Sequence, residues 1–172
     1  MSDDRITTKA ELRRWLQADA EAIRLRKGII HMNVCWRFLK ALRKYEYNLN
    51  RPQGIWQRLM RLISNLRWYY WSVKTGISVH PNCFGAGLAL WHFGALQVNY
   101  TCKGGKNVTI QSGVCVMKDV TLGNGVYLAP GAKVLEGVSI ADDVTIGANA
   151  VVTHSITEPG TVWAGVPAKR IR

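Results

Sequence analysis

The chain has 172 residues, of which 48% are hydrophobic and 20% are charged, and its formal net charge is +12. This length gives room for one domain, or one domain with an appendage, and the composition is not that of a disordered chain. No apolar run approaches the roughly 18 residues of a membrane-spanning helix. The four cysteines include no Cys-x-x-Cys pair, and the start carries no signal-peptide pattern, so we expect the reducing cytosol.

The positive charge is concentrated in the first part of the chain. Residues 1–76 hold 16 Lys and Arg against 6 Asp and Glu, which leaves +10, whereas residues 77–172 hold 7 against 5, which leaves +2. We therefore predict two units, a basic α-helical module over 1–76 and a second domain over 77–172.

Three amphipathic helices are predicted within the basic module. Thr8 and Glu11 have the spacing of a capping box, ahead of a helix that ends at about residue 27. A second helix is expected over about 33–47, and a third over about 55–74, after a break that contains Pro and Gly. The third helix is expected to bury one apolar stripe, formed by Ile55, Leu59, Leu62, Ile63, Leu66 and Tyr70.

The basic helices also hold five of the seven tryptophans. The interpretation that we favour has these rings packing the helices onto each other and onto the following domain, while the arginines are solvated. The alternative is a surface that contacts anionic lipid headgroups, at the inner face of a membrane, or an acidic polymer. Nucleic acid is a weaker third option, because no recognised nucleic-acid motif accompanies the basicity.

A strict period of six organises residues 98–156. Every sixth residue from Val98 is a branched aliphatic in nine of ten cases, Gly104 being the exception, and the column four residues later holds only small or β-branched residues. Neither a strand, with a period of two, nor a helix, with a period of 3.6, fits this spacing. The pattern predicts a parallel β-helix of about five coils that share one core, with a regular β-sandwich as the alternative.

The repeat is irregular before Val98. Phe84, Leu90 and Leu96 continue the second column backwards, which places His92 in the first, aliphatic column. A polar side chain in that register indicates either a function or a buried structural histidine.

Three motifs lie in this second domain. The first is the run over 79–94, with the pattern Phe-Gly-x-Gly-Leu-x-Leu-x-His-x-Gly, and the others lie over 146–152 and 164–169. Together they resemble the left-handed β-helix acyltransferases of the serine acetyltransferase type, in which they form the first-coil, late-coil and closing motifs. With residues 38–47, they are most similar to the shorter enzymes encoded with capsule and exopolysaccharide genes. The resemblance implies a left-handed parallel β-helix and a homotrimer.

Two departures from that family concern the acceptor. Ser78 stands where serine acetyltransferases have an aspartate that orients the catalytic histidine, and residues 113–120 run through without the family's loop that carries a second, substrate-binding histidine. The helical module is also shorter than the family's. These differences favour an acceptor other than serine.

The resemblance implies that His92 is the catalytic base. Histidine can take the proton of a hydroxyl and return it to the departing thiolate, in a ternary complex without an acyl-enzyme. Backbone N–H groups near Gly94 are candidates for the oxyanion site, and Ser78 and His80 are candidates for the acceptor pocket or for supporting His92.

The co-substrate implied by the family is acetyl-CoA, bound in the groove between two β-helices of the trimer. Carried over to this sequence, Gly147, Ala148 and Ala164 would contact it through the backbone, and Lys169 and Arg170 would meet its phosphates. The alternative for these two cations is a solvated C-terminal tail.

The function that we expect is acetyl-CoA-dependent O-acetylation of a sugar hydroxyl, in a bacterial surface polysaccharide or its precursor. The alternatives are serine O-acetylation for cysteine biosynthesis and a non-catalytic β-helix that serves as a scaffold or binding module. We expect no metal, because the four dispersed histidines lack the three-ligand signature of a zinc β-helix such as the gamma-class carbonic anhydrases.

Overall fold

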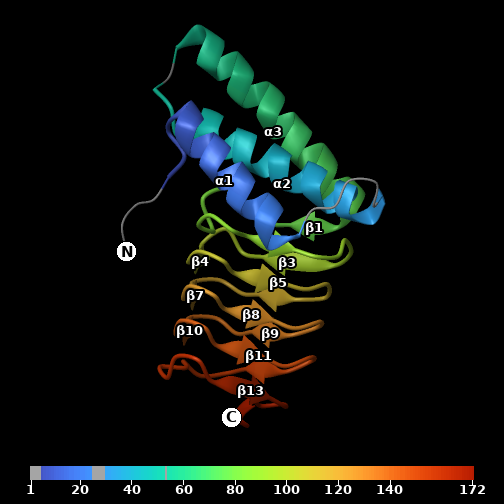
Figure 1. Ribbon diagram of the computed structural model, residues 1–172, viewed down its shortest axis with the longest axis vertical. Helices are drawn as coiled ribbons and strands as arrows, with labels where there is room; N and C mark the ends of the chain where they lie inside the picture. Colours follow the sequence, from blue (N-terminus) through green and yellow to red (C-terminus); the bar gives the residue numbers. More distant parts are fainter. Residues whose placement is uncertain (1–4, 25–29, 53) are drawn as a thin grey trace.

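The computed structural model describes residues 5–24, 30–52 and 54–172, apart from the side chains of 30–33. Three helices come first, α1 (Lys9–Ala22), α2 (Ile30–Leu49) and α3 (Ile55–Thr75). They lie across one end of a stack of coils, and the chain ends at the opposite end of the stack (Figure 1). The three predicted helices are thus confirmed, although the first ends at Ala22, before the end predicted near residue 27, which itself lies outside the described residues.

The capping box that begins α1 is also present. The Thr8 hydroxyl accepts the N–H of Glu11 at 3.2 Å, and the Glu11 carboxylate accepts the N–H of Thr8 at 2.9 Å. Two backbone donors that the helix itself leaves unpaired are satisfied in this way.

The rest of the chain forms short strands separated by turns. They are β1 (Ile77–Ser78), β2 (Ala89–Leu90), β3 (Leu96–Val98), β4 (Lys103–Gly104), β5 (Thr109–Ile110), β6 (Cys115–Val116), β7 (Thr121–Leu122), β8 (Tyr127–Leu128), β9 (Lys133–Val134), β10 (Ser139–Ile140), β11 (Thr145–Ile146), β12 (Val151–Val152), β13 (Val162–Ala164) and β14 (Lys169–Arg170).

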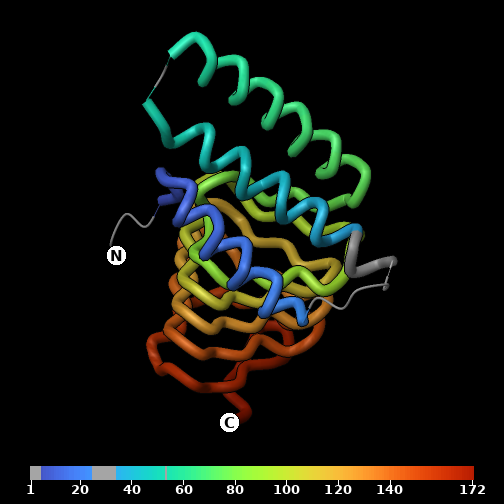
Figure 2. The backbone as a smooth tube through the Cα atoms, turned by 45° about the horizontal axis from the view of Figure 1, so that its top comes forward, coloured from blue at the N-terminus to red at the C-terminus, as the bar shows by residue number. Residues whose placement is uncertain are grey.

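The strands form three sheets, which are the three faces of the coils (Figure 2). Their orders are β1-β3-β6-β9-β12, β4-β7-β10 and β2-β5-β8-β11-β13-β14, and every pair is parallel except β13 with the terminal β14. In the regular coils each residue pairs with the residue 18 positions on, as Val98 does with Val116, and Val116 with Val134. Three hexads therefore make one coil, and the predicted parallel β-helix is confirmed.

The two apolar columns fill the interior of the coils. Their residues from Val108 to Ile156 are at most 3% exposed, so each coil contributes aliphatic area to one continuous core. Gly104, the exception in the first column, faces the Phe84 ring, and a Cβ atom built on it would lie 2.1 Å from Cδ1 of that ring. The aromatic side chain of the preceding coil thus occupies the space that an aliphatic residue would fill.

The register expected for the first coil was wrong. Leu90 pairs with Ile110 and Phe84 with Gly104, so both residues belong to the first column, whereas Leu96 does lie in the second, above Val114. These partners are 20 residues apart, because the loop that follows Leu90 is two residues longer than in the regular coils. His92 therefore lies outside the interior, exposed on that loop.

The helices and the β-helix share one apolar core. Phe38, Leu39 and Leu42 of α2 and Trp71 of α3 are buried in the same cluster as Ile77 and the interior of the coils. The helices thus cover the open end of the first coil. All four cysteines are free thiols; Cys115 is half-buried, and the other three are buried and pack as small core residues.

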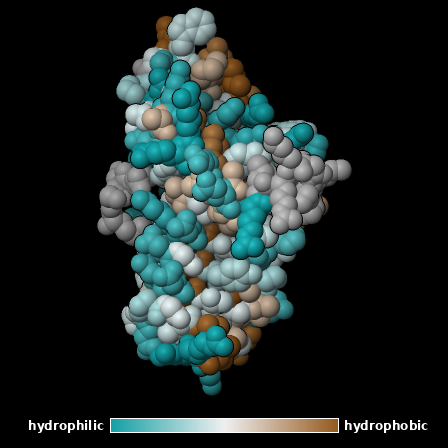
Figure 3. Space-filling model, viewed as in Figure 1, coloured by the Kyte–Doolittle hydropathy of each residue, from teal (hydrophilic) through white to brown (hydrophobic). Residues whose placement is uncertain are grey.

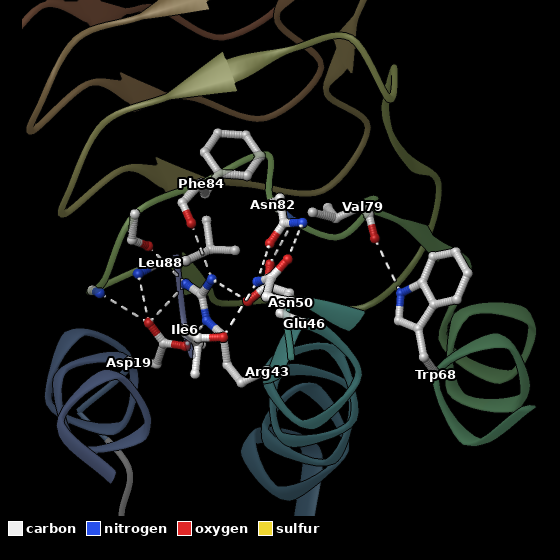
Figure 4. A network of polar contacts seen from close by, with 12 residues as sticks. Ile6, Asp19, Arg43, Glu46, Asn50, Trp68, Val79, Asn82, Phe84 and Leu88 are labelled. Atoms are coloured by element: carbon white, nitrogen blue, oxygen red, sulfur yellow. Dashed lines mark hydrogen bonds and ion pairs between the residues drawn. The ribbon is translucent and has the colours of Figure 1, made fainter. Parts of the chain in front are cut away.

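A buried charge network joins the helices to the first coil (Figure 4). The Arg43 guanidinium binds Asp19 at 2.7 Å and Glu46 at 3.0 Å, and it donates to the carbonyls of Phe84 and Gly85 at 3.0 and 2.7 Å. Asp19 also accepts the N–H groups of Gly87 and Leu88, each at 2.9 Å. One arginine of α2 thereby fixes α1 and the turn before β2 in place.

The burial predicted for the third helix is wrong. The side chains that α3 buries are Ser64, Trp71 and Thr75, whereas the expected stripe is open, with Ile55 86% and Leu66 59% exposed. The amphipathic pattern correctly places these residues on one face, but that face points away from α2 and the coils.

Candidate functional site

His92 lies on the loop between β2 and β3, which is held against the end of α3. The N–H of Gly94 donates to the Thr75 carbonyl at 2.7 Å, and the N–H of Leu96 donates to the Gly76 carbonyl at 3.1 Å. Gly94 has a φ of +121°, which L side chains rarely adopt. Because its own N–H is already paired, Gly94 itself is the poorer candidate for an oxyanion donor, and the role of the other backbone N–H groups near it stays a prediction.

One edge of the β-helix carries His92 and a run of turns below it. The ladder Leu90, Ile110, Leu128, Ile146 and Trp163 stacks the segments that follow β2, β5, β8 and β11. We call these stacked segments the His92 edge, and they include Gln111–Ser112, Ala129–Pro130 and Gly147–Ala148. His92 and Gly147 are therefore on the same edge, three coil steps or about 14 Å apart along the axis.

The residues expected to contact CoA gather at the last coils. The N–H of Gly147 donates to the Trp163 carbonyl at 2.8 Å, and Ala164 pairs with Lys169 across the β13–β14 ladder. A Cβ on Gly147 would lie 3.0 Å from that of Ala164, so the close packing of these two coils favours glycine. The N–H of Gly147 is thus paired within the protein, whereas Ala148 is exposed on the turn.

The two terminal cations differ in their surroundings. Lys169 is exposed, while the Arg170 guanidinium pairs with the Glu158 carboxylate and donates to the Arg172 carbonyl at 3.2 Å. A partner that already neutralises Arg170 makes it the poorer candidate for a phosphate.

A second candidate site, the Ser78 groove, lies on the sheet that contains β1, β3 and β6. It has a volume of about 410 Å³, and its lining includes Ser78, His80, Gln97, Asn99, Lys118 and Glu136. Lys118 and Glu136, which both belong to this lining, form an ion pair at 2.8 Å. His92 is not part of this lining, so one chain brings Ser78 and His80 together but leaves His92 on the edge that precedes this sheet.

His80 is held between two aromatic rings. The centroid of its ring lies 5.7 Å from that of Trp68 and 6.1 Å from that of Tyr100, and Trp68 is itself fixed by donating to the Val79 carbonyl at 3.1 Å. Burial lowers the pKa of His80 below its ordinary value of 6.5, which favours the neutral ring at pH 7. A neutral imidazole has one nitrogen that accepts a hydrogen bond from a hydroxyl.

Sequence reasoning missed one residue of the His92 edge. Gln111 follows Ile110 directly, one coil below His92, and it is only 9% exposed. Its amide donates to the Tyr127 hydroxyl at 3.2 Å. The available signal was a polar residue immediately after a buried aliphatic one, which the hexad pattern alone does not distinguish from an ordinary turn residue.

The remaining histidines lie elsewhere. His154 is exposed, with its Nδ1 atom 2.8 Å from the Thr153 hydroxyl, and the side chain of His31 lies outside the described residues. Within the described part of the chain, no group of three or more His, Cys, Asp or Glu side chains is placed to hold a metal ion.

Sequence comparison finds one protein family that matches part of the chain, and several similar proteins. The family described as bacterial transferase hexapeptide (six repeats) matches residues 119–154. A serine acetyltransferase of Helicobacter pylori (strain J99) is 34% identical over 151 residues, which cover 83% of this chain and 80% of the relative. That of Mycobacterium tuberculosis (strain H37Rv) is 33% identical over 126 residues, covering 68% of this chain and 55% of the relative.

Solved structures agree on the fold. A serine acetyltransferase in complex with CoA has a TM-score of 0.72 at 22% identity, covering 95% of this chain and 71% of that one. The Neisseria gonorrhoeae serine acetyltransferase in complex with serine has a TM-score of 0.72 at 21% identity, covering 95% of this chain and 70% of that one.

Proposed function

The chain belongs to the serine acetyltransferase family of hexapeptide-repeat acyltransferases, and we propose that it transfers the acetyl group of acetyl-CoA to an alcohol, with His92 as general base. The protein is an acyltransferase.

The observation that carries this proposal is the shared edge of His92 and the late coils. An exposed imidazole stands at one end of the edge, and Ala148, Ala164 and the Lys169 cation stand at the other. The pantetheine arm of CoA would extend along the intervening turns, placing the thioester at His92 and the phosphates near Lys169. Turns with small residues such as Ala129 and Gly147 leave room for that arm.

In the reaction assigned to His92, a single proton moves twice, first onto the imidazole and then onto the departing thiolate. The neutral imidazole takes the proton of the acceptor hydroxyl while the oxygen attacks the thioester carbonyl carbon. The tetrahedral intermediate then breaks its carbon–sulfur bond, and the imidazolium returns the proton to the departing thiolate. The products are an acetyl ester and free CoA, with no covalent enzyme intermediate.

Serine is the acceptor that the relatives favour. The relatives from Helicobacter pylori and Mycobacterium tuberculosis are serine acetyltransferases, and one solved neighbour is a complex with serine. We therefore place serine O-acetylation first among the acceptors.

A sugar hydroxyl in a surface polysaccharide or its precursor is the second candidate, and two features of this chain favour it. Ser78 occupies the position of the family's aspartate, and the coil over 113–120 keeps the regular 18-residue pairing of β6 with β9, without an inserted loop. The Ser78 groove consequently stays open, and the polar side chains in its lining suit a larger hydroxyl-rich acceptor.

The location of the two sites supports a homotrimer. The His92 edge and the Ser78 groove lie on different parts of one chain, so the acceptor and the base would meet when the edge of one subunit faces the groove of its neighbour. Sedimentation of the purified protein at three times the chain mass would support this arrangement, and a monomer with full activity would contradict it.

The test of the function is CoA release from acetyl-CoA with serine and with a panel of saccharides, for the wild type and His92→Gln. We expect the substitution to lower kcat about 10²- to 10⁴-fold with little change in the KM for acetyl-CoA. His154→Gln, which changes an exposed histidine outside the site, should retain full activity. Turnover with serine alone would settle the acceptor in favour of serine, turnover with a saccharide alone would favour the second candidate, and undiminished activity of His92→Gln would remove His92 from the mechanism.

A further inference from the structure

Helix α3 presents an unusually apolar surface to the outside. Of the 15 large hydrophobic residues that are exposed in the described part of the chain, 10 lie on α3. Figure 3 shows hydrophobic side chains along the outer side of this helix. The most open are Ile55 at 86%, Trp56 at 74%, Val73 at 67%, Tyr69 at 62% and Leu66 at 59%.

These side chains share one face of the helix. Steps of three and four residues bring Ile55, Leu59, Leu62, Ile63, Leu66, Tyr69, Tyr70 and Val73 onto the same side, which we call the outer face of α3. The opposite side already packs on the protein through Ser64, Trp71 and Thr75. The outer face is therefore not left open by poor packing; the helix has a separate, narrower face for the core.

The charges beside the outer face are all positive. Arg58, Arg61, Arg67 and Lys74 are exposed, and the sequence of α3 contains no acidic residue. At 3.6 residues per turn, Arg58 borders one side of the outer face, and Arg67 and Lys74 border the other.

Neighbouring cations of α2 extend this basic surface. Burial lowers the pKa of Lys40, and the nearby positive charges of Lys44, Arg37 and Arg67 lower it further. Like charges held this close together repel each other unless an anionic partner is bound.

We propose that the outer face of α3 binds, parallel to the surface, to membranes that contain anionic lipids. Apolar and aromatic side chains flanked by Lys and Arg are the pattern of a helix that lies at the interface between headgroups and acyl chains. Among the described residues, no helix has both the length and the apolarity that a bilayer-spanning segment needs. This location goes beyond the proposed acetyl transfer and does not depend on it.

Charge favours a lipid surface over a second copy of the chain as the occupant. Two α3 helices packed face to face would bring their arginines together, without an acidic residue on either helix to compensate. Anionic headgroups supply that compensation, and their attraction to Lys and Arg weakens as salt is added. Since the Thr75 carbonyl holds the His92 loop, docking of α3 would also place that loop close to the membrane.

The test is flotation of the full chain with phosphatidylcholine vesicles and with vesicles that also contain phosphatidylglycerol. We expect flotation with the anionic vesicles only, and weaker flotation at high salt. Ile63→Gln combined with Leu66→Gln should reduce binding about tenfold or more, because it removes apolar contact at the interface. Arg58→Gln combined with Arg67→Gln should reduce it while leaving the apolar face intact.

Ile171→Gln is the matched control, because it makes the same kind of change at a residue that is 67% exposed but distant from α3 in the chain. It should bind like the wild type, and thermal unfolding should show that all variants are folded. Protein that stays in solution with anionic vesicles at low salt overturns the proposal. A fall in sedimentation mass for the Ile63/Leu66 variant without vesicles would instead assign the outer face to contacts between copies of the chain.

Discussion

Arg43 carries the contact between the helical module and the first coil at the level of a single residue. It is fully buried, and its donors reach two carboxylates and two backbone carbonyls. A charge in the interior is tolerated only when such partners replace water. Asp19 is buried to the same extent, and Glu46 also accepts the N–H of Asn82 at 2.8 Å. The carboxylates therefore need Arg43 as their positive partner as much as Arg43 needs them.

Replacing Arg43 should therefore destabilise the fold strongly. We expect Arg43→Met to lower the free energy of unfolding by about 3–5 kcal/mol, because Asp19 and Glu46 lose their positive partner within the core. Urea unfolding followed by circular dichroism measures this change. Arg61→Met, at an exposed position of α3, should stay within about 0.5 kcal/mol of the wild type. Equal effects of the two substitutions would mean that the buried network contributes little.

His80 should make stability depend on pH. Burial lowers its pKa in the folded state, so the unfolded chain, with a value near 6.5, binds the proton more tightly. Stability should thus be lost as the pH falls through about 6.5 and should be unaffected well above it. The measurement is the difference in unfolding free energy between the wild type and His80→Gln from about pH 8 to about pH 5. A difference that is constant with pH would show that the ring titrates alike in both states.

At the scale of the strand, the contact between Phe84 and Gly104 interlocks two coils. A methyl group at position 104 would lie 2.1 Å from the ring, so Gly104→Ala must displace the ring or the backbone. We expect a loss of about 1–3 kcal/mol, as for other overpacked cores. Combined with Phe84→Leu, the same alanine should cost less than it does alone, because the smaller side chain leaves room for it.

A double-mutant cycle measures this coupling. Urea unfolding of the wild type, the two single variants and the pair gives the interaction free energy directly. Additive effects would show that Phe84 moves aside without cost and that the contact does not fix the register of the first coil.

The same elements show how much of the fold could be predicted from the sequence. The regular coils could be predicted, because every hexad buries the same two positions and the repeat in the sequence is therefore also the repeat in the structure. The first coil could not be predicted, because the two additional residues after Leu90 shift the register of the repeat. The spacing of apolar residues does not reveal an insertion within a turn. For α3, periodicity locates an apolar face, but what covers that face depends on tertiary contacts that periodicity does not contain.

On the scale of the whole molecule, a stacked fold brings distant motifs onto one edge. The gathering of Gly147, Ala164 and Lys169 at the last coils could be anticipated from their motifs. The sequence does not allow one to anticipate that His92 lies on the same edge and that the Ser78 groove lies apart from it. Both positions depend on the number of residues in each turn between the motifs.

A stack of coils also has two ends, and each needs a cover that prevents further pairing of strands. Helix α2 covers the first coil, and β14 turns back to pair with β13 at the last one. The N–H of Val162 donates to the Arg172 carbonyl at 3.0 Å, and the N–H of Ile171 donates to the Val162 carbonyl at 2.8 Å. Residues 169–172 therefore stabilise the last coil through their backbone, while the Lys169 side chain is the proposed phosphate contact.

Two variants separate these roles of the chain end. Lys169→Ala keeps the backbone pairing, so it should raise the KM for acetyl-CoA a few-fold, with little change in kcat and in unfolding free energy. A chain that ends at Ala168 loses the same cation together with the whole β13–β14 pairing, and it should be less stable by at least about 2 kcal/mol, at about 1 kcal/mol for each backbone hydrogen bond lost. Kinetics with varied acetyl-CoA and urea unfolding measure the two effects. If Lys169→Ala leaves the KM for acetyl-CoA unchanged while the truncated chain raises it, the contact with the co-substrate lies in the backbone of the last strand. If neither variant alters this KM, the phosphates bind elsewhere on the His92 edge.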